Sequence, residues 1–326
     1  MSGLLVLGVD AGGSSSIARA AAANDASRLV GQWSGRAANL TVHGVDEVAA
    51  SLIKLLHTAS DQVGKAFAAV AIGVAGAGDE LLRDRLEREL VAAFPASPIV
   101  VTHDGAPLFE YGEGGGAVVA IAGTGSFVIG RSAHGSEKEV GRREPKVIRS
   151  AGWGPLLGDE GSAYRVVLDT LAQAVKQIDP LDFDAMKIPA NSAAAPCLLA
   201  ILDELDGTDL GTIKMLANNL AQRPRLARCF HRVLKLADSG DVLAQSVVQR
   251  HAAALASDVG KVWSRIARDG LQPTLVLSGG ALVHQPSYRG RVVQAIEEIL
   301  GPITPVLVKD PVEGAIRMAI RLLPVS

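Results

Sequence analysis

Two glycine-rich turns with hydroxyl side chains are the first candidates for chemistry. "DAGGSSS" (10–16) follows an apolar run, and "AGTGS" (122–126) lies between two apolar runs. Glycine lets backbone N–H groups approach an anion without interference from a Cβ, and successive N–H groups form an anion-binding nest. Two such turns suit the phosphates of a nucleoside triphosphate, although a tight hairpin turn alone would also need glycine.

Two acidic residues stand where apolar runs end. Asp10 closes the run that starts at residue 4, and Asp104 closes "PIVVTHDG" (98–105). Open α/β sheets bind ligands at the carboxyl ends of their strands. Asp10 could hold Mg²⁺ directly or through water. Asp104 could accept the proton of a substrate hydroxyl that attacks phosphorus, or it could simply cap a following helix.

The segment "SAGWGPLLGDEGSAY" (150–164) holds four glycines, a tryptophan and two adjacent acids. Asp159 or Glu160 could bind sugar hydroxyls, since ionised carboxylates accept short, strong hydrogen bonds; alternatively, both cap a helix. "AANLT" (37–41) offers Asn39 as a further sugar ligand. "LVLSGGAL" (275–282) places a glycine pair after a strand, suited either to adenine or to a tight turn.

The apolar pattern predicts the elements that position these motifs. Strands are expected over 4–10, 69–76, 98–105, 116–123, 126–132, 146–152, 273–280 and 304–310, and helices over 45–60, 79–94, 288–300 and 311–323. Residues 16–24 and 27–34 are strand candidates, although the first, rich in alanine, could be helical. Residues 160–270 are mainly helical. The order describes two successive β-β-β-α-β-α-β-α units, an internal repeat.

Composition limits the class of protein. The chain has 326 residues, 48% hydrophobic and 20% charged, with a formal net charge of −2 and 4% aromatic residues. This balance argues against nucleic-acid binding and favours small ligands. Cys197 and Cys229 have no metal or redox spacing and are expected to be buried or inert thiols. A disulfide framework is not expected from these two cysteines, so we predict a cytoplasmic protein in a reducing compartment. No signal peptide or membrane span is expected either.

Together, "GVDAGGSSS", "VTHDGA", "IAGTGS", "GWGPLLGDEGSAY" and "LSGGAL" resemble the BadF/BadG/BcrA/BcrD ATPase family, and within it the N-acetylglucosamine kinases. The resemblance covers residues 4 to about 320. It implies an α/β fold of two ribonuclease H-like (actin-like ATPase) domains with an interdomain cleft. The first would span 1–115 with a returning helix at 311–326. The second would span 116–310, with a helical insertion at about 160–270.

The resemblance also implies an activity and a site. ATP and Mg²⁺ would serve to phosphorylate an amino sugar, N-acetylglucosamine at its 6-hydroxyl, with Asp104 as catalytic base and Asp10 organising the metal. The positions matching the sugar pocket are Asn39, Asp104, Gly125, Gly152, Trp153, Asp159 and Ala163. Those matching the nucleotide site are Gly12, Gly13, Ser14, Thr124, Gly125, Gly279 and Gly280. Expected partners are the sugar and ATP, and neither nucleic acid nor a membrane. The motifs do not decide whether the chain forms a homodimer.

Departures from the family pattern leave alternatives. The first motif is usually closer to D-G-G-G-T-K-T, whereas this chain lacks the basic residue, and Ala75 and Ala151 replace residues common in relatives. Glucosamine and N-acetylmuramic acid therefore remain alternative substrates. Iron–sulfur ATPase activators of acyl-CoA dehydratases or reductases belong to the same family, but two scattered cysteines suit cluster ligation poorly. A sugar sensor without catalysis is a further alternative.

Overall fold

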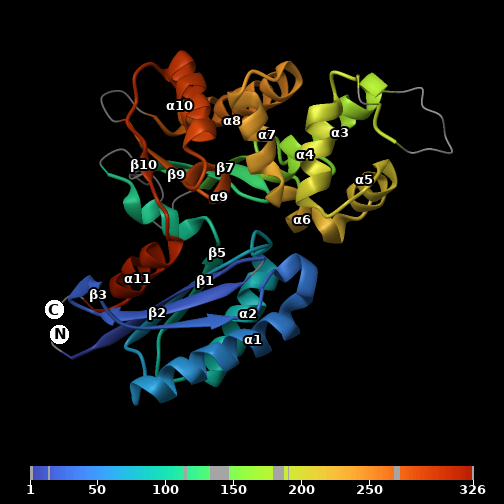
Figure 1. Ribbon diagram of the computed structural model, residues 1–326. Helices are drawn as coiled ribbons and strands as arrows, with labels where there is room; N and C mark the ends of the chain where they lie inside the picture. Colours follow the sequence, from blue (N-terminus) through green and yellow to red (C-terminus); the bar gives the residue numbers. More distant parts are fainter. Residues whose placement is uncertain are drawn as a thin grey trace. The chain divides into compact units, whose positions relative to one another are not determined.

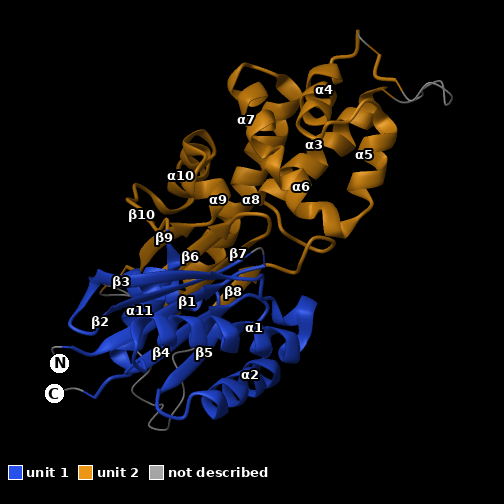
Figure 2. Cartoon of the chain, turned by 60° about the horizontal axis from the view of Figure 1, so that its bottom comes forward, with its two compact units in different colours: residues 1–111, 310–326 blue, residues 112–309 orange. Residues whose placement is uncertain are grey.

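The computed structural model describes residues 3–13, 15–113, 116–132, 147–178, 187–189, 191–267 and 272–324. Ser14 and most of the polar 131–146 stretch therefore lie outside the described residues. The chain forms two compact units (Figure 2). Unit 1 comprises residues 1–111 and 310–326, and unit 2 comprises residues 112–309.

Unit 1 is built on a five-stranded mixed sheet. Its strands are β1 (Leu5–Ala11), β2 (Ser16–Ala22), β3 (Asp25–Gly35), β4 (Ala69–Val74) and β5 (Ile99–His103), in the order β3-β2-β1-β4-β5. The first three pair antiparallel, and β1, β4 and β5 pair parallel. The alanine-rich segment is strand rather than helix, because it pairs with a strand on each side.

Helices cover the sheet of unit 1 on both faces (Figure 1). They are α1 (Leu40–Val63), α2 (Glu80–Ala93) and α11 (Pro311–Arg321), with a short 3-10 helix, η1 (Ala106–Tyr111). Side chains alternate along β1: Leu5 and Leu7 join the core under α1 and α2, whereas Val6 packs with Ile316 of α11. This period of two is what a strand covered on both faces requires.

Gly8 of β1 allows α11 to lie directly against the sheet, which gives a prediction. A Cβ at Gly8 would come 2.5 Å from the backbone nitrogen of Ile316. Gly8→Ala should therefore lower the free energy of unfolding by about 1–3 kcal/mol, measured by urea denaturation. The control is Gly290 of α10 (Pro286–Leu300), where a Cβ meets nothing within 4 Å. Gly290→Ala should stabilise by about 0.5–1 kcal/mol, and equal effects would contradict the close packing.

Unit 2 repeats the strand order of unit 1. Its strands are β6 (Gly116–Ala122), β7 (Ser126–Ser132), β8 (Val147–Ala151), β9 (Thr274–Ser278) and β10 (Val306–Leu307), in the order β8-β7-β6-β9-β10. Again the first three pair antiparallel and the rest parallel. The predicted α/β class and the internal repeat are confirmed.

The long helical region of unit 2 separates β8 from β9, where unit 1 has only α1 between β3 and β4. It contains α3 (Ala163–Ile178), α4 (Ala195–Glu204), α5 (Leu210–Ala217), η2 (Leu220–Gln222), α6 (Arg223–Arg228), α7 (Phe230–Asp238) and α8 (Val242–Ile266); α9 (Gly280–Val283) follows β9. Cys197 and Cys229 are free thiols buried in this unit's core. Within the ranges given above, no helix is both long and apolar enough to cross a membrane.

Candidate functional site

Two acids of unit 1 meet at one edge of its sheet. Asp10 is the penultimate residue of β1, and Asp104 directly follows β5. Because these strands run parallel with β4 between them, their carboxyl ends share one edge. Burial raises the pKa of Asp10 to about 7, with contributions from the charges of Asp104 and Asp310. The charges of Asp104 and Asp310 thus oppose ionisation of Asp10, which favours a cation beside it. We call this edge, with Asp10, Asp104 and Asp310, the acidic edge.

Main-chain hydrogen bonds hold this edge together. The nitrogen of Ala75 donates to the carbonyl of Ala11 at 2.9 Å, and the nitrogen of Leu40 donates to the carbonyl of Ala75 at 2.9 Å. The nitrogen of Asp104 donates to the carbonyl of Val74 at 3.2 Å. The loops after β1, β4 and β5 are thereby fixed to one another and to the start of α1, so the Asp104 backbone is pre-positioned.

Asn39 caps a helix, and its side-chain amide lies beside the first glycine turn. Its Oδ1 accepts from the backbone nitrogen of Thr41 at 3.0 Å and caps α1. A Cβ at Gly76, whose φ is +74°, would come 2.5 Å from this Oδ1. The amide Nδ2 lies 3.9 Å from the position of a Cβ on Gly13. Asn39 therefore presents a hydrogen-bond donor beside the first glycine turn, whose Gly12 accepts from the nitrogen of Ala38 at 2.9 Å.

The acidic edge fits a magnesium ion that also binds phosphates. Among the residues that the structure describes, no three or more Asp, Glu, His or Cys side chains converge closely enough to hold a metal alone. Mg²⁺ commonly takes one or two protein carboxylates and completes its shell with phosphate oxygens and water. Asp10 meets this requirement, whereas Asp310 already forms an ion pair with Arg19. Asp310, remote in sequence from Asp10, was not predicted as part of this edge.

In unit 2, the second glycine turn joins β6 to β7 and touches the start of α3. The nitrogen of Gly123 donates to the carbonyl of Gly125 at 2.8 Å, which closes the turn around Thr124. The nitrogen of Ala163, the first residue of α3, donates to the carbonyl of Gly123 at 2.8 Å. Main-chain hydrogen bonds of Gly123 thus bring together three predicted site residues: Thr124, Gly125 and Ala163.

The glycine pair after β9 adjoins the same turn. Gly279 has a φ of +91°, and a Cβ there would come 2.4 Å from the carbonyl oxygen of Ala122. Gly280 opens α9, and its nitrogen lies 3.7 Å from the position of a Cβ on Gly123. Only glycine allows this approach, so the predicted phosphate and adenosine residues of unit 2 are neighbours.

Asp159 is buried beside the second turn and forms an ion pair there. Its φ is +68°, and its Oδ1 accepts from the backbone nitrogen of Ser126 at 3.3 Å. Its Oδ2 accepts from Nη2 of Arg223, on α6, at 2.7 Å. Burial raises the pKa of Asp159, although the Ser126 N–H and the Arg223 charge oppose the shift. Asp159 does not cap α3; Ser162 does, accepting from the nitrogen of Arg165 at 3.1 Å.

Gly152 and Trp153 follow β8 in unit 2. Gly152 has a φ of +71°, and a Cβ there would come 2.7 Å from Cβ of Phe127. Trp153 is 75% exposed, with the guanidinium carbon of Arg149 6.0 Å from its ring centroid. Gly152 thus packs against β7, while the indole ring remains accessible, as a binding role requires.

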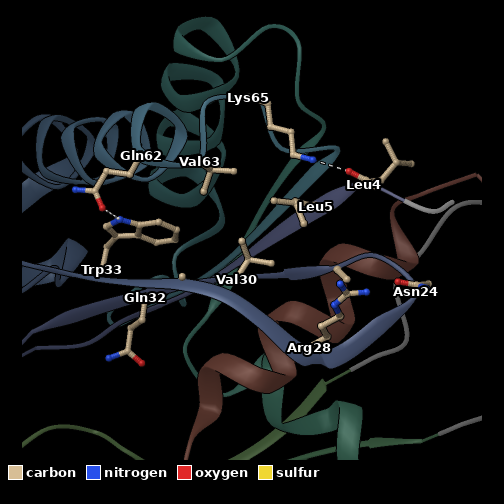
Figure 3. A pocket seen from close by; sticks show the side chains of 13 residues that line it. Leu4, Leu5, Asn24, Arg28, Val30, Gln32, Trp33, Gln62, Val63 and Lys65 are labelled. Carbon is tan, nitrogen blue, oxygen red and sulfur yellow. Dashed lines mark hydrogen bonds between the residues drawn. The ribbon is translucent and has the colours of Figure 1, made fainter.

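A cavity of about 600 Å³ in unit 1 lies beside the start of β1 and the strand β3 (Figure 3). Leu5, at the start of β1, and Trp33 line it. Trp33 Nε1 donates to Oε1 of Gln62 at 2.7 Å, and Lys65 Nζ donates to the carbonyl of Gly3 at 2.6 Å. The predicted site residues do not line this cavity.

Two solved structures share the fold of this chain. The solved structure of a protein from Chromobacterium violaceum, provisionally called an N-acetylglucosamine kinase, has a TM-score of 0.69 at 18% identity and covers 97% of this chain and 99% of its own. A ROK family glucokinase from Streptomyces griseus, solved with glucose and AMPPNP, has a TM-score of 0.60 at 15% identity, covering 97% and 99%. At these identities the likeness shows a shared fold.

Sequence comparison gives the family. The N-acetylmuramic acid/N-acetylglucosamine kinase of Clostridium acetobutylicum is 28% identical over 178 residues, which are 53% of this chain and 54% of that protein. The match thus spans about half the length of that relative. The BadF/BadG/BcrA/BcrD ATPase family model matches residues 7–319. Because this match extends over nearly the whole chain, the protein belongs to the BadF/BadG/BcrA/BcrD ATPase family.

Proposed function

We propose that this protein is an ATP-dependent kinase that phosphorylates an amino sugar, N-acetylglucosamine, at its 6-hydroxyl. The observation that carries the proposal is that Asp104 and Asp10 lie at the same edge of a sheet, where main-chain hydrogen bonds join the ends of the strands. The ATPase family and the fold of the sugar kinases support ATP as phosphoryl donor. The relative that acts on N-acetylglucosamine and N-acetylmuramic acid supports the choice of sugar.

In the proposed reaction, Asp104 acts as general base. The oxygen of the sugar hydroxyl attacks the γ-phosphorus of ATP, and its proton passes to the Asp104 carboxylate. The bond between the γ-phosphorus and the bridging oxygen breaks, and ADP leaves. The hydrogen bond from the backbone nitrogen of Asp104 to the carbonyl of Val74 fixes the main chain of Asp104, which lowers the cost of orienting its side chain during the reaction.

Asp10 would hold Mg²⁺, which would neutralise the charge of the phosphates when bound. The raised pKa of Asp10 gives this a physical basis, since a cation relieves the unfavourable charge that burial and Asp104 impose. The Arg19 ion pair compensates Asp310, so Asp310 is assigned no metal contact.

The remaining predicted residues are proposed to bind the ligands. Backbone N–H groups of the glycine turns, at Gly13, Ser14, Thr124 and Gly125, would contact the phosphates. Gly12 would close the first turn around them, since its own N–H donates to the carbonyl of Ser15 at 2.9 Å. Gly279 and Gly280 would pack against the adenosine. In unit 1, Asn39 would donate from Nδ2 to a sugar hydroxyl. In unit 2, the residues proposed to contact the sugar are Gly152, Trp153, Asp159 and Ala163.

A parallel measurement of ADP release tests this proposal. Mg-ATP is supplied with N-acetylglucosamine, glucosamine, N-acetylmuramic acid, glucose or no sugar. The expected result is ADP formation that depends on sugar and has the highest kcat/KM with N-acetylglucosamine. Preference for N-acetylmuramic acid or glucosamine would overturn the choice of sugar. ADP release unaffected by any sugar, or none at all, would overturn the kinase assignment.

A further inference from the structure

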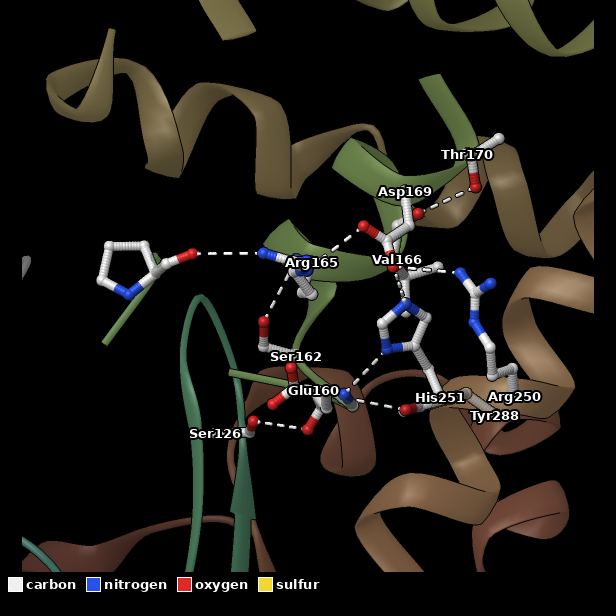
Figure 4. Close-up of polar contacts among 12 residues, drawn as sticks. Ser126, Glu160, Ser162, Arg165, Val166, Asp169, Thr170, Arg250, His251 and Tyr288 are labelled. Carbon is white, nitrogen blue, oxygen red and sulfur yellow. Dashed lines mark hydrogen bonds and ion pairs between the residues drawn. The ribbon is translucent and has the colours of Figure 1, made fainter. Parts of the chain in front are cut away.

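The peptide groups of Gly161 are clamped by side chains from two distant helices of unit 2 (Figure 4). The Gly161 N–H donates to Nδ1 of His251, on α8, at 3.1 Å. The Gly161 carbonyl accepts from the hydroxyl of Tyr288, on α10, at 2.8 Å. Gly161 has a φ of +88°, and a Cβ there would come 2.9 Å from Cβ of Leu255. This residue lies two positions after Asp159, in the segment proposed to bind the sugar.

The contacts of His251 define how its imidazole is used. A backbone N–H can only donate, so Nδ1 must carry the lone pair that accepts from Gly161. The ring proton then resides on Nε2, which lies 3.1 Å from Oδ2 of Asp169 on α3. His251 is 2% exposed, so water does not compete for either contact. The imidazole thus connects Asp169 to the Gly161 peptide in one tautomer.

Asp169 connects this imidazole to a second part of the same segment. Burial opposes ionisation of Asp169, but the hydrogen bond from His251 and the charges of Arg165 and Arg250 outweigh it and lower the pKa. Nε of Arg165 lies 3.2 Å from Oδ1 of Asp169, and Nη1 donates to the carbonyl of Pro155 at 3.4 Å. The carboxylate of Asp169 is therefore linked to Gly161 through His251, and to Pro155 through Arg165.

Short contacts transmit the position of Gly161 to the second glycine turn. The carbonyl of Glu160, the neighbour of Gly161, accepts from the hydroxyl of Ser126 at 2.7 Å. The nitrogen of Ser162, its other neighbour, donates to the carbonyl of Asp159 at 3.0 Å. The carboxylate oxygens of Asp159 lie 3.3 Å from the position of a Cβ on Gly125. A shift of the Gly161 peptide would therefore move Asp159 relative to this turn.

We infer that His251 is a positioning residue for the proposed kinase reaction: with its tautomer set by Gly161 and Asp169, it fixes the Gly161 peptide and, through it, the carboxylate of Asp159. This inference rests on the proposed function. Neither His251 nor Asp169 is assigned a contact with substrate. If the contacts of His251 only stabilised the fold, loss of either one would have a similar effect on turnover. If His251 positions Asp159, loss of its contact with Gly161 should lower turnover more than loss of its contact with Asp169.

Two variants separate the two contacts of His251. In His251→Asn, an amide oxygen near the position of Nδ1 can still accept from Gly161, and the contact with Asp169 is lost. In His251→Gln, an amide NH₂ near the position of Nε2 can still donate to Asp169, and the contact with Gly161 is lost. We expect the glutamine variant to lower kcat by about 10- to 100-fold with a nearly unchanged KM for ATP. The asparagine variant should keep most of the turnover.

Thr170→Val is the matched control. Thr170 is buried beside Asp169 on α3, and its hydroxyl donates to the carbonyl of Val166 at 2.8 Å, without touching Gly161. This variant should leave kcat unchanged. Thermal unfolding midpoints are measured for all three variants. Equal loss of kcat in the asparagine and glutamine variants, or loss that follows the unfolding midpoint alone, would overturn the inference.

Hydrogen–deuterium exchange of the Gly161 amide gives a readout that does not need turnover. Protection should persist in His251→Asn and fall in His251→Gln. Unchanged exchange in the glutamine variant would overturn the clamp. If the wild-type chain phosphorylates no hexosamine, the proposed function is wrong, and His251 has no positioning role in a kinase reaction. The exchange experiment still decides whether His251 fixes the Gly161 peptide.

Discussion

Asp104→Asn is expected to lower kcat by about 100- to 10,000-fold, because an amide cannot accept the proton of the sugar hydroxyl. The amide has nearly the same size, and main-chain contacts fix this loop to the end of β4. Affinities for sugar and ATP should therefore persist. Steady-state kinetics give kcat, and titration calorimetry with sugar and a non-hydrolysable ATP analogue gives the dissociation constants.

The control is the same chemical change elsewhere in unit 1. Asp79 caps α2 by accepting from the nitrogens of Leu81 and Leu82, and asparagine caps helices about as well. Asp79→Asn should leave kcat and binding unchanged. Near-normal turnover of Asp104→Asn would remove Asp104 as the base. Loss of sugar binding in that variant would instead make it a ligand residue.

Asp10→Asn is expected to abolish most activity and yet stabilise the metal-free chain. Loss of the metal contact should lower kcat by on the order of 100-fold. Burial, with the charges of Asp104 and Asp310, raises the pKa of Asp10 from 3.8 to about 7. Between these values the folded chain holds a proton that the unfolded chain has released. The free energy of unfolding of the wild type should therefore fall as pH rises through this window, by at most about 4 kcal/mol.

Urea unfolding of both chains without Mg²⁺, at pH 4, 5.5, 7 and 8, checks this expectation. The stability advantage of Asp10→Asn should be smallest at pH 4 and reach its full size above pH 7. Asp25→Asn is the control, because hydrogen bonds to Ser27 lower the pKa of exposed Asp25, an effect of opposite sign. Parallel curves for Asp10→Asn and the wild type across this range would contradict the raised pKa.

Local sequence patterns were enough for most of the fold. The run at residues 4–10 is β1, and the amphipathic pattern at 79–94 is α2 with Asp79 as its cap. The helix predicted to start at 45 begins at Leu40. Gly44 has non-helical dihedral angles and interrupts the helical period, so the pattern predicted only the part of α1 from residue 45 onward. The strand predicted over 304–310 is shorter in the structure: β10 (Val306–Leu307) stands at the end of the strand order and pairs with β9.

The site was predictable only where its residues are close in the chain. The glycine turns and the Gly152–Ala163 segment are contiguous motifs, so their residue types alone suggested a role. Arg223 contacts Asp159 across 64 positions, and His251 contacts Gly161 across 90. No local periodicity encodes such pairs, because they depend on how the helical region packs on the turn. The spacing of Arg165 and Asp169 was a signal, but it is also that of an ordinary helical ion pair.

Transfer of the γ-phosphoryl group itself tests the central claim most directly. The chain is incubated with Mg²⁺, N-acetylglucosamine and ATP labelled with ³²P in the γ position, beside Asp104→Asn. We predict label in a sugar 6-phosphate with the wild type, in amounts equal to the ADP formed, and almost none with the variant. Label released only as inorganic phosphate, at a rate independent of sugar, would contradict the kinase and indicate an ATPase without a sugar acceptor.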